Sequence, residues 1–273
     1  MPCSRPRVTL PPSQTKKTRM ARDAAGFEFD VVVVGASFAG AACAIAAARR
    51  GLRVCVLERK RDPGDKLRTT GIIVKEAAEQ TLLQHLPAAM TRRIESVRLY
   101  APSLKQVALA APGYYFLTTD TPAVMRWLAG QLRRYGAELR LGCAFTDAGR
   151  IDGGWEVAGV GRTRYLVGAD GARSRVARRC GLGEVRQFLY GIEYEFPGAR
   201  LADAGALHCF IASVMRRATS AGWRRTPAAC RPGWRCATTP RRRGCRTSTA
   251  SCCGWASPAA CRATCARATR APG

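Results

Sequence analysis

The sequence predicts an α/β fold, and three observations near its start support that prediction. Residues Phe27 to Val34 form a mostly apolar run that ends in four consecutive valines, which is typical of a strand buried on both faces. Small residues from Gly40 to Arg50 predict a helix, which Gly51 ends. A second apolar run, Leu52 to Leu57, completes a βαβ unit. Together they predict a sheet of the Rossmann type.

Helix and strand patterns continue to about residue 213. A helix is expected over 74–86, and another begins at Thr121-Pro122. Two strands are expected within 97–117, on either side of Pro112-Gly113. Further strands are expected at 138–145, 155–160, 163–168, 186–196 and 206–212.

These patterns divide the chain into four parts. Residues 1–28 lack periodicity and are expected to be a disordered extension. Residues 29–185 are expected to form a nucleotide-binding domain, with 97–117 contributing to an antiparallel sheet over the substrate. Residues 186–213 begin a substrate domain that is truncated, which would leave its strands without later partners. Residues 214–273 form the tail.

The composition of the tail differs sharply from that of the rest. From Arg216 onward only Ala, Arg, Thr, Ser, Gly, Trp, Pro and Cys occur, and such a set of residues forms no patterned core. All eight types have codons with G or C at the middle base, as expected when a GC-rich gene is read in a shifted frame. We therefore expect residues 214–273 to be out of frame and unstructured.

The formal net charge of +26 is concentrated at the two ends. Residues 1–20 hold five Lys or Arg and no acid, and residues 216–273 hold thirteen Arg and no acid. The tail has no lysine and no evident binding module, so we expect no specific nucleic-acid partner. No apolar run reaches transmembrane length and no signal-peptide pattern occurs, so we expect a cytoplasmic protein.

The thirteen cysteines predict neither a disulfide framework nor a metal site. Six precede Ala229 and are scattered mainly through apolar stretches, as buried free thiols are. In the tail, Cys261 and Cys265 come nearest to zinc-ligand spacing, but the tail contains no histidine. The two histidines, His85 and His208, lie far apart and are expected to be structural.

The turn after the first strand carries a dinucleotide-binding pattern. The pattern comprises Gly35, Ala36, Ser37, Phe38, Ala39 and Gly40. Gly35 permits a tight turn and Gly40 permits close packing, while Ser37 stands where the second glycine of the G-x-G-x-x-G pattern lies. The helix that follows presents N–H groups to a pyrophosphate. Glu58 ends the second strand, where a carboxylate accepts hydrogen bonds from ribose hydroxyls. Arg59, the next residue, is a further candidate for cofactor binding.

A second motif indicates which dinucleotide is bound. Residues Tyr165 to Arg178 follow an apolar strand and place Asp170-Gly171 at a turn into a helix. This segment resembles the Asp-Gly motif of the flavoprotein hydroxylase superfamily, which includes the geranylgeranyl reductases. The resemblance covers residues 28–213. It implies FAD beside Asp170 and Gly171, with NAD(P)H as electron donor. Ala177 stands where that family usually has arginine.

The resemblance also implies two arginines near the cofactor. Arg68 falls in Asp65–Gly71, where the family has a loop near the flavin, and Arg126 lies on the helix after Asp120. A later family motif, Gly-Asp followed by a helix that points at the flavin ring, has no match in this chain. No catalytic side chain is therefore predicted.

The function that the resemblance implies is that of an FAD-dependent oxidoreductase. The nearest likeness is to the geranylgeranyl reductases, which reduce C=C bonds of prenyl chains. The truncated chain itself is expected to be inactive. An NAD(P)H-dependent monooxygenase of aromatic or other small molecules is the alternative, and a non-functional frameshifted product is a third interpretation. The expected substrate is an apolar or aromatic small molecule, and a prenyl lipid would add peripheral contact with a membrane.

Overall fold

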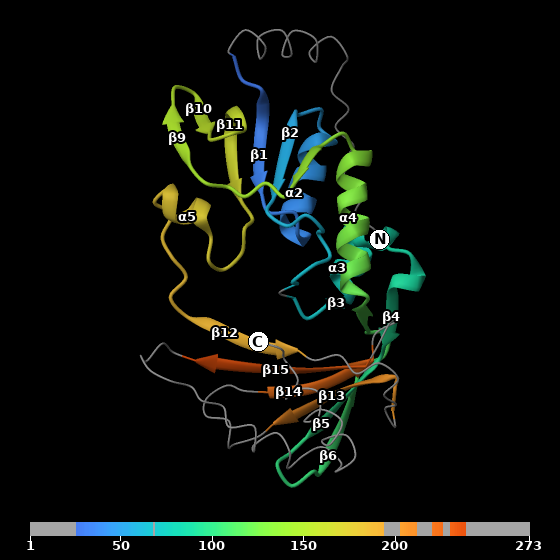
Figure 1. Cartoon of the computed structure of the whole chain (residues 1–273). Helices are drawn as coiled ribbons and strands as arrows, with labels where there is room; N and C mark the ends of the chain where they lie inside the picture. Colours follow the sequence, from blue (N-terminus) through green and yellow to red (C-terminus); the bar gives the residue numbers. More distant parts are fainter. Residues whose placement is uncertain (1–25, 68, 194–202, 212–219, 226–229, 239–273) are drawn as a thin grey trace, which may run out of the picture. The chain divides into compact units, whose positions relative to one another are not determined.

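The computed structural model describes residues 26–67, 69–193, 203–211, 220–225 and 230–238. Within these ranges the strands form two six-stranded sheets and one three-stranded sheet. The first six-stranded sheet has the order β8-β2-β1-β11-β10-β9 (Figure 1). Its strands are β1 (Phe29–Val34), β2 (Val54–Glu58), β8 (Glu138–Leu141), β9 (Ala148–Ile151), β10 (Gly154–Val157) and β11 (Gly161–Gly168).

The centre of the first sheet is parallel, as the βαβ pattern predicts. Strand β1 pairs in parallel with β2 and β11, and β2 pairs in parallel with β8. Val32, Val33 and Val56 are fully buried, so both faces of the central strands are covered. Strands β9 and β10 form an antiparallel hairpin at one edge. The sequence did not predict β9, whose four residues include two small ones and an arginine.

Two helices pack on one face of this sheet. They are α2 (Phe38–Ala48) and α4 (Thr121–Arg134). Ile45 of α2 and Leu132 of α4 are buried in one hydrophobic core with Val33 of β1. Asp120 precedes α4, and its carboxylate accepts a hydrogen bond from the amide of Ala123 at 3.2 Å. This N-cap confirms the predicted start of the helix.

A three-stranded sheet with the order β3-β7-β4 is accompanied by short helices. The elements are β3 (Ile72–Val74), α3 (Lys75–Gln80), the 3₁₀ helices η1 (Leu82–His85) and η2 (Ala88–Met90), β4 (Thr91–Ile94) and β7 (Phe116–Thr119). The single helix expected over 74–86 is interrupted at Thr81, whose backbone is extended. The Thr81 hydroxyl accepts a hydrogen bond from the amide of Leu83 and starts η1 instead.

The second six-stranded sheet has the order β12-β15-β14-β13-β5-β6. Its strands are β5 (Ser96–Tyr100), β6 (Gln106–Ala110), β12 (Phe188–Glu193), β13 (Ala206–Ile211), β14 (Ser220–Arg225) and β15 (Cys230–Thr238). Strands β5 and β6 form an antiparallel hairpin, whereas β13 runs parallel to β5. The sheet is therefore mixed rather than antiparallel as expected. The parallel pair arises because β13 returns to β5 through a long connection instead of a hairpin.

The strands within 97–117 also differ from the prediction. This region holds parts of three strands rather than two, and the β5–β6 hairpin turns at Ala101 to Lys105. The turn at Pro112-Gly113 instead leads from β6 to β7, which belongs to a different sheet. Because the sequence is nearly continuously apolar from β6 to β7, its pattern gives no sign that the two strands belong to different sheets.

Two segments of the tail form strands, contrary to the expectation of an unstructured tail from residue 214. Strand β14 pairs with β13, and β15 pairs with β14 and β12, all antiparallel. Strands β12 and β13 therefore do have later partners. Such pairing uses backbone N–H and C=O groups, so it does not need large aliphatic side chains. The remaining tail residues, and residues 1–25, lie outside the described ranges.

Candidate cofactor site

The turn after β1 is closed by Gly35 and packs against the turn after β11. Gly35 has a φ of +102°, a conformation that favours glycine, and its amide donates to the carbonyl of Leu57 at 2.8 Å. A β-carbon at Gly35 would lie 2.3 Å from the carbonyl oxygen of Ala169. The amide of Ala169 in turn donates to the carbonyl of Val34 at 2.8 Å. The two motifs found in the sequence are therefore in direct contact.

Helix α2 begins immediately after the Gly35 turn. Ser37 is its N-cap residue, but the Ser37 side chain makes no capping hydrogen bond. Because first-turn amides have no partner within a helix, those of Phe38 and Ala39 can donate to an external acceptor. Gly40 is buried, and a β-carbon there would lie 1.8 Å from the carbonyl oxygen of Gly35. Glycine is thus required at position 40 for the helix to approach the turn.

Glu58 lies at the end of β2, beside the same turn. Its side chain is nearly fully buried, with the residue only 7% exposed. One carboxylate oxygen accepts a hydrogen bond from the amide of Ala36 at 3.1 Å, and the other accepts from the amide of Lys60 at 3.0 Å. Each carboxylate oxygen can accept a further hydrogen bond. Arg59, the next residue, is exposed.

Asp170 orders the turn that follows β11. The Ser174 hydroxyl donates to one oxygen of its carboxylate at 2.6 Å, and the amide of Arg175 donates to the other at 2.6 Å. Ser174 also accepts from the amide of Ala177 at 2.9 Å, which caps the short helix α5 (Arg175–Arg179). Gly171 has a φ of +86°, and no atom lies within 4 Å of a β-carbon built there. The backbone at Gly171 is therefore accessible to a ligand.

Of the two arginines implied by the resemblance, the structure describes only Arg126. Arg68 lies outside the described residues. Arg126 forms an ion pair with Asp62 at 2.7 Å, and its side chain is 57% exposed. The hydrogen bond from Arg126 lowers the pKa of Asp62. Since Asp62 also accepts from the amide of Gly64 at 2.9 Å, this pair holds the loop after β2 against α4.

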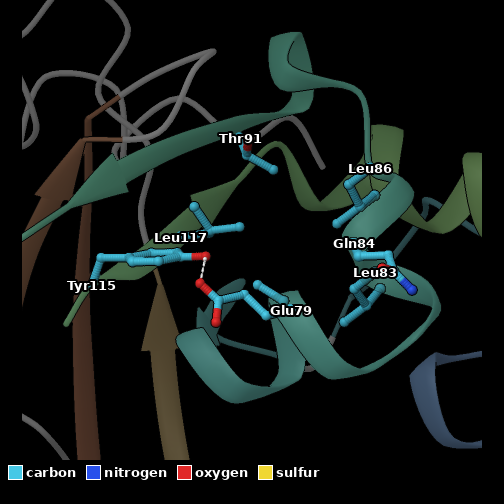
Figure 2. Close-up of a pocket in the computed structure, with 8 residues that line it drawn as sticks. Glu79, Leu83, Gln84, Leu86, Thr91, Tyr115 and Leu117 are labelled. Atoms are coloured by element: carbon cyan, nitrogen blue, oxygen red, sulfur yellow. Dashed lines mark hydrogen bonds between the residues drawn. The ribbon is translucent and has the colours of Figure 1, made fainter. Parts of the chain in front are cut away.

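A cavity of about 310 Å³ lies elsewhere, among α3, η1, β4 and β7. Its lining residues are Ala78, Glu79, Leu83, Gln84, Leu86, Thr91, Tyr115 and Leu117. Figure 2 shows the Tyr115 hydroxyl pointing at Glu79, to which it donates at 3.0 Å. Burial and this acceptor raise the pKa of Tyr115. None of the residues predicted to bind the cofactor lines this cavity. Its lining residues are spread along the sequence without a recognisable motif, so the sequence did not predict it.

Within the described ranges, no three His, Cys, Asp or Glu residues are grouped to hold a metal ion. His208 is buried, and both of its ring nitrogens have partners, which agrees with a structural role. Nδ1 lies 3.0 Å from the Tyr100 hydroxyl, and Nε2 lies 2.7 Å from the carbonyl oxygen of Asp203. In the same part of the chain, none of the helices has the length and apolar character needed to cross a membrane.

Comparison with known proteins identifies relatives of this chain. A family model described as FAD dependent oxidoreductase matches residues 30–120. The chain is 34% identical over 161 residues to a probable electron transfer flavoprotein-quinone oxidoreductase of Escherichia coli, covering 56% of the chain and 38% of that protein. It is 33% identical over 167 residues to digeranylgeranylglycerophospholipid reductase 2 of Methanopyrus kandleri, covering 57% of the chain and 40% of that protein.

A third relative is matched over most of its length. The chain is 33% identical over 170 residues to a Methanosarcina barkeri protein from the nifH2 5' region, covering 56% of the chain and 88% of that protein. A solved structure from Thermoplasma acidophilum, described as geranylgeranyl bacteriochlorophyll reductase-like, aligns with a TM-score of 0.67 at 18% identity, covering 76% of the chain and 56% of that structure. This likeness confirms the α/β fold. The chain spans about two-fifths of the first two relatives.

Proposed function

Because the chain belongs to the FAD-dependent oxidoreductases, we propose that residues 29–185 bind FAD in an enzyme resembling the geranylgeranyl reductases. One observation carries the proposal. Glu58, the first turn of α2 and the Asp170-Gly171 turn meet at the carboxyl ends of the parallel strands β1, β2 and β11. Ligands of open α/β sheets bind at that edge.

The residues present fit the ADP half of FAD. The open amides of Phe38 and Ala39, with that of Ser37, would donate to the pyrophosphate at the positive end of α2. Buried Glu58 keeps acceptor capacity beyond its two amide donors and would receive the ribose hydroxyls. The glycines at 35 and 40 let the backbone approach the ligand.

The second motif would serve the flavin half. Asp170 holds its turn in place, and the uncovered backbone of Gly171 would lie against the cofactor. Arg59 remains a proposed cofactor-binding residue, and Arg68 remains a proposed contact of the flavin or the pyrophosphate. Arg126 would act indirectly by holding the Asp62 loop. Bound FAD supplies two-electron redox chemistry, and the protein contributes position and electrostatics.

We further propose a cytoplasmic enzyme that takes electrons from NAD(P)H and reduces C=C bonds of a prenyl chain. Curated relatives from five archaeal species carry the name digeranylgeranylglycerophospholipid reductase, which supports this substrate class. In the monooxygenase alternative, O₂ rather than a prenyl chain would reoxidise the reduced cofactor.

Cofactor binding is tested by titrating FAD with the purified product of a gene restored to one continuous frame and following flavin fluorescence. We expect saturable quenching, with FAD recovered intact from the complex after heating. NADH in place of FAD is the control for general dinucleotide affinity. Binding of NADH with no binding of FAD would contradict the proposal.

The reaction type is tested with a gene restored to one continuous frame. In the absence of oxygen, a prenyl lipid should reoxidise the reduced protein and gain two hydrogens at one C=C bond. Reoxidation only in the presence of O₂, with one oxygen atom in the product and the other released as water, would establish the monooxygenase alternative instead.

A further inference from the structure

The hairpin of β5 and β6 projects apolar side chains into solvent. Strand β6 is the edge strand of its sheet (Figure 1). Every residue from Pro102 to Gly113 is exposed. Leu104 and Val107 are each 58% exposed and Leu109 is 49% exposed. Large exposed apolar side chains gathered on one element indicate a contact surface.

The conformation of Leu104 adds a second, independent observation. Its φ is +64°, in the left-handed region that bulky residues rarely adopt. The amide of Leu104 donates to the carbonyl of Ala101 at 2.9 Å, and the amide of Ala101 donates to the carbonyl of Lys105 at 2.9 Å. Glycine or asparagine would suit this turn position better. A strained residue that also exposes its apolar side chain suggests a functional role for that side chain.

The exposed residues share one face of the sheet. Val107 pairs with Leu99 and Leu109 pairs with Val97, so these four side chains lie on the same face. On β13, Cys209 pairs with Leu99, which puts Ile211, two residues further on, on this face as well. Ile211 is 49% exposed. The apolar face thus extends over three neighbouring strands.

The charges of the hairpin point to the nature of the partner. No Asp or Glu occurs from Ser96 to Thr119, whereas Arg98 and Lys105 are cationic. Arg98 is paired with Asp203 at 2.9 Å, so Lys105, exposed at the turn next to Leu104, provides the cation at the hairpin tip. An apolar tip with an adjacent lysine matches the boundary of an anionic bilayer, where acyl chains lie below negative headgroups.

We propose that the hairpin tip, through Leu104, Val107 and Lys105, docks on the surface of an anionic phospholipid bilayer. A second copy of the chain fits this surface less well, because two such hairpins would bring like charges together without any acid between them. The docking does not depend on the assignment of the cofactor.

The test measures binding of the full chain to vesicles of phosphatidylcholine with and without phosphatidylglycerol, by co-sedimentation. The basic ends of the chain would also attract such vesicles. The apolar contribution is therefore measured at roughly 0.5 M salt, where the screening length is about 4 Å. Leu104→Gly should weaken this binding about tenfold, because a largely inserted leucine side chain is lost. Leu182→Ser is the matched control, because Leu182 is 76% exposed but lies outside the hairpin.

Two further readouts separate docking from damage to the fold. Leu104→Gly removes backbone strain, so its melting temperature should be equal to or above that of the unmodified chain. At low salt, Lys105→Gln should weaken binding to phosphatidylglycerol vesicles about fivefold and leave binding to pure phosphatidylcholine unchanged. The fluorescence that Leu104→Trp adds to that of the five native tryptophans should be quenched by lipids brominated on their acyl chains, whereas the fluorescence that Leu182→Trp adds should not.

Equal vesicle binding by Leu104→Gly and Leu182→Ser would overturn the proposal, as would equal quenching at the two positions. A dimer in sedimentation velocity that Leu104→Gly dissociates, with vesicle binding unchanged, would assign the surface to a second copy and overturn the proposal as well.

Discussion

The carboxylate of Glu58 accepts a hydrogen bond from the amide of Ala36 at 3.1 Å, which ties the end of β2 to the turn after β1. Glu58 therefore has a structural role even when no ligand is bound. It also lies where the ribose of a dinucleotide would bind. These two roles can be separated, because the hydrogen bond from the Ala36 amide affects the stability of the fold, whereas the ribose contact affects the affinity for the dinucleotide.

Replacing Glu58 with Gln should lower FAD affinity about tenfold or more, because a charge-assisted hydrogen bond worth roughly 1.5–3 kcal/mol is lost. Isothermal titration of the purified variant measures the change. Glu156→Gln is the control, since Glu156 is exposed on β10. Unchanged FAD affinity in Glu58→Gln would limit Glu58 to its structural role.

Replacing Gly35 with Ala should destabilise the fold by about 3 kcal/mol or more, because the new β-carbon meets the Ala169 carbonyl and the φ is unfavourable. Urea unfolding measures this loss. Gly51→Ala isolates the conformational cost, because Gly51 also has a positive φ but has no atom near its β-carbon position. That variant should lose only about 1–2 kcal/mol. Equal losses would mean that the contact between the two turns contributes nothing.

Replacing Asp170 with Ala should cost about 1–2 kcal/mol, because the acceptor for Ser174 and for the amide of Arg175 is removed. Ser174→Ala should cost a similar amount. The double variant should lose less than the sum, since both residues hold one turn. Thermal unfolding of the unmodified chain, the two single variants and the double variant completes this double-mutant cycle. Strict additivity would show that the two side chains act independently.

Cys55 should resist alkylation in the folded protein. Burial raises the pKa of its thiol to about 11, so about one molecule in a thousand carries the thiolate at pH 8. Cys43 and Cys143 are partly exposed and should react first. Iodoacetamide labelling followed by peptide mass spectrometry compares the three rates. Labelling of Cys55 as fast as Cys143 would show that β2 opens readily.

The frame hypothesis predicts a lost or gained base within the codons for Cys209 to Ser220. Genomic sequencing decides this directly. An intact reading frame would contradict the hypothesis. The pairing of β14 and β15 with β12 and β13 would then be the native completion of the second sheet.

The parts of the fold that the sequence predicts are those encoded by neighbouring residues. The run of valines in β1, the small residues of α2 and Asp120 before α4 each specify a local element. By contrast, the parallel pairing of β5 with β13 depends on residues far apart in the chain, and no local pattern encodes it.

The candidate site follows the same distinction. The glycines and Glu58 have recognisable spacing, so their meeting at one sheet edge was predictable. The ion pair between Arg126 and Asp62 was not predictable, because the two residues lie on separate elements and either could have faced solvent. The left-handed conformation of Leu104 was also hidden, since nothing in its neighbours marks a position normally suited to glycine.

The parallel pair of β5 and β13 has a consequence for the order of folding. Arg98 on β5 forms an ion pair with Asp203, which lies just before β13, and the two residues are 105 apart in the sequence. Closing so long a loop is entropically slow compared with forming the β5–β6 hairpin. A newly synthesised chain therefore exposes the unpaired side of β5 until β13 has left the ribosome. During that interval, the unpaired edge of β5 is open to mispairing with another chain.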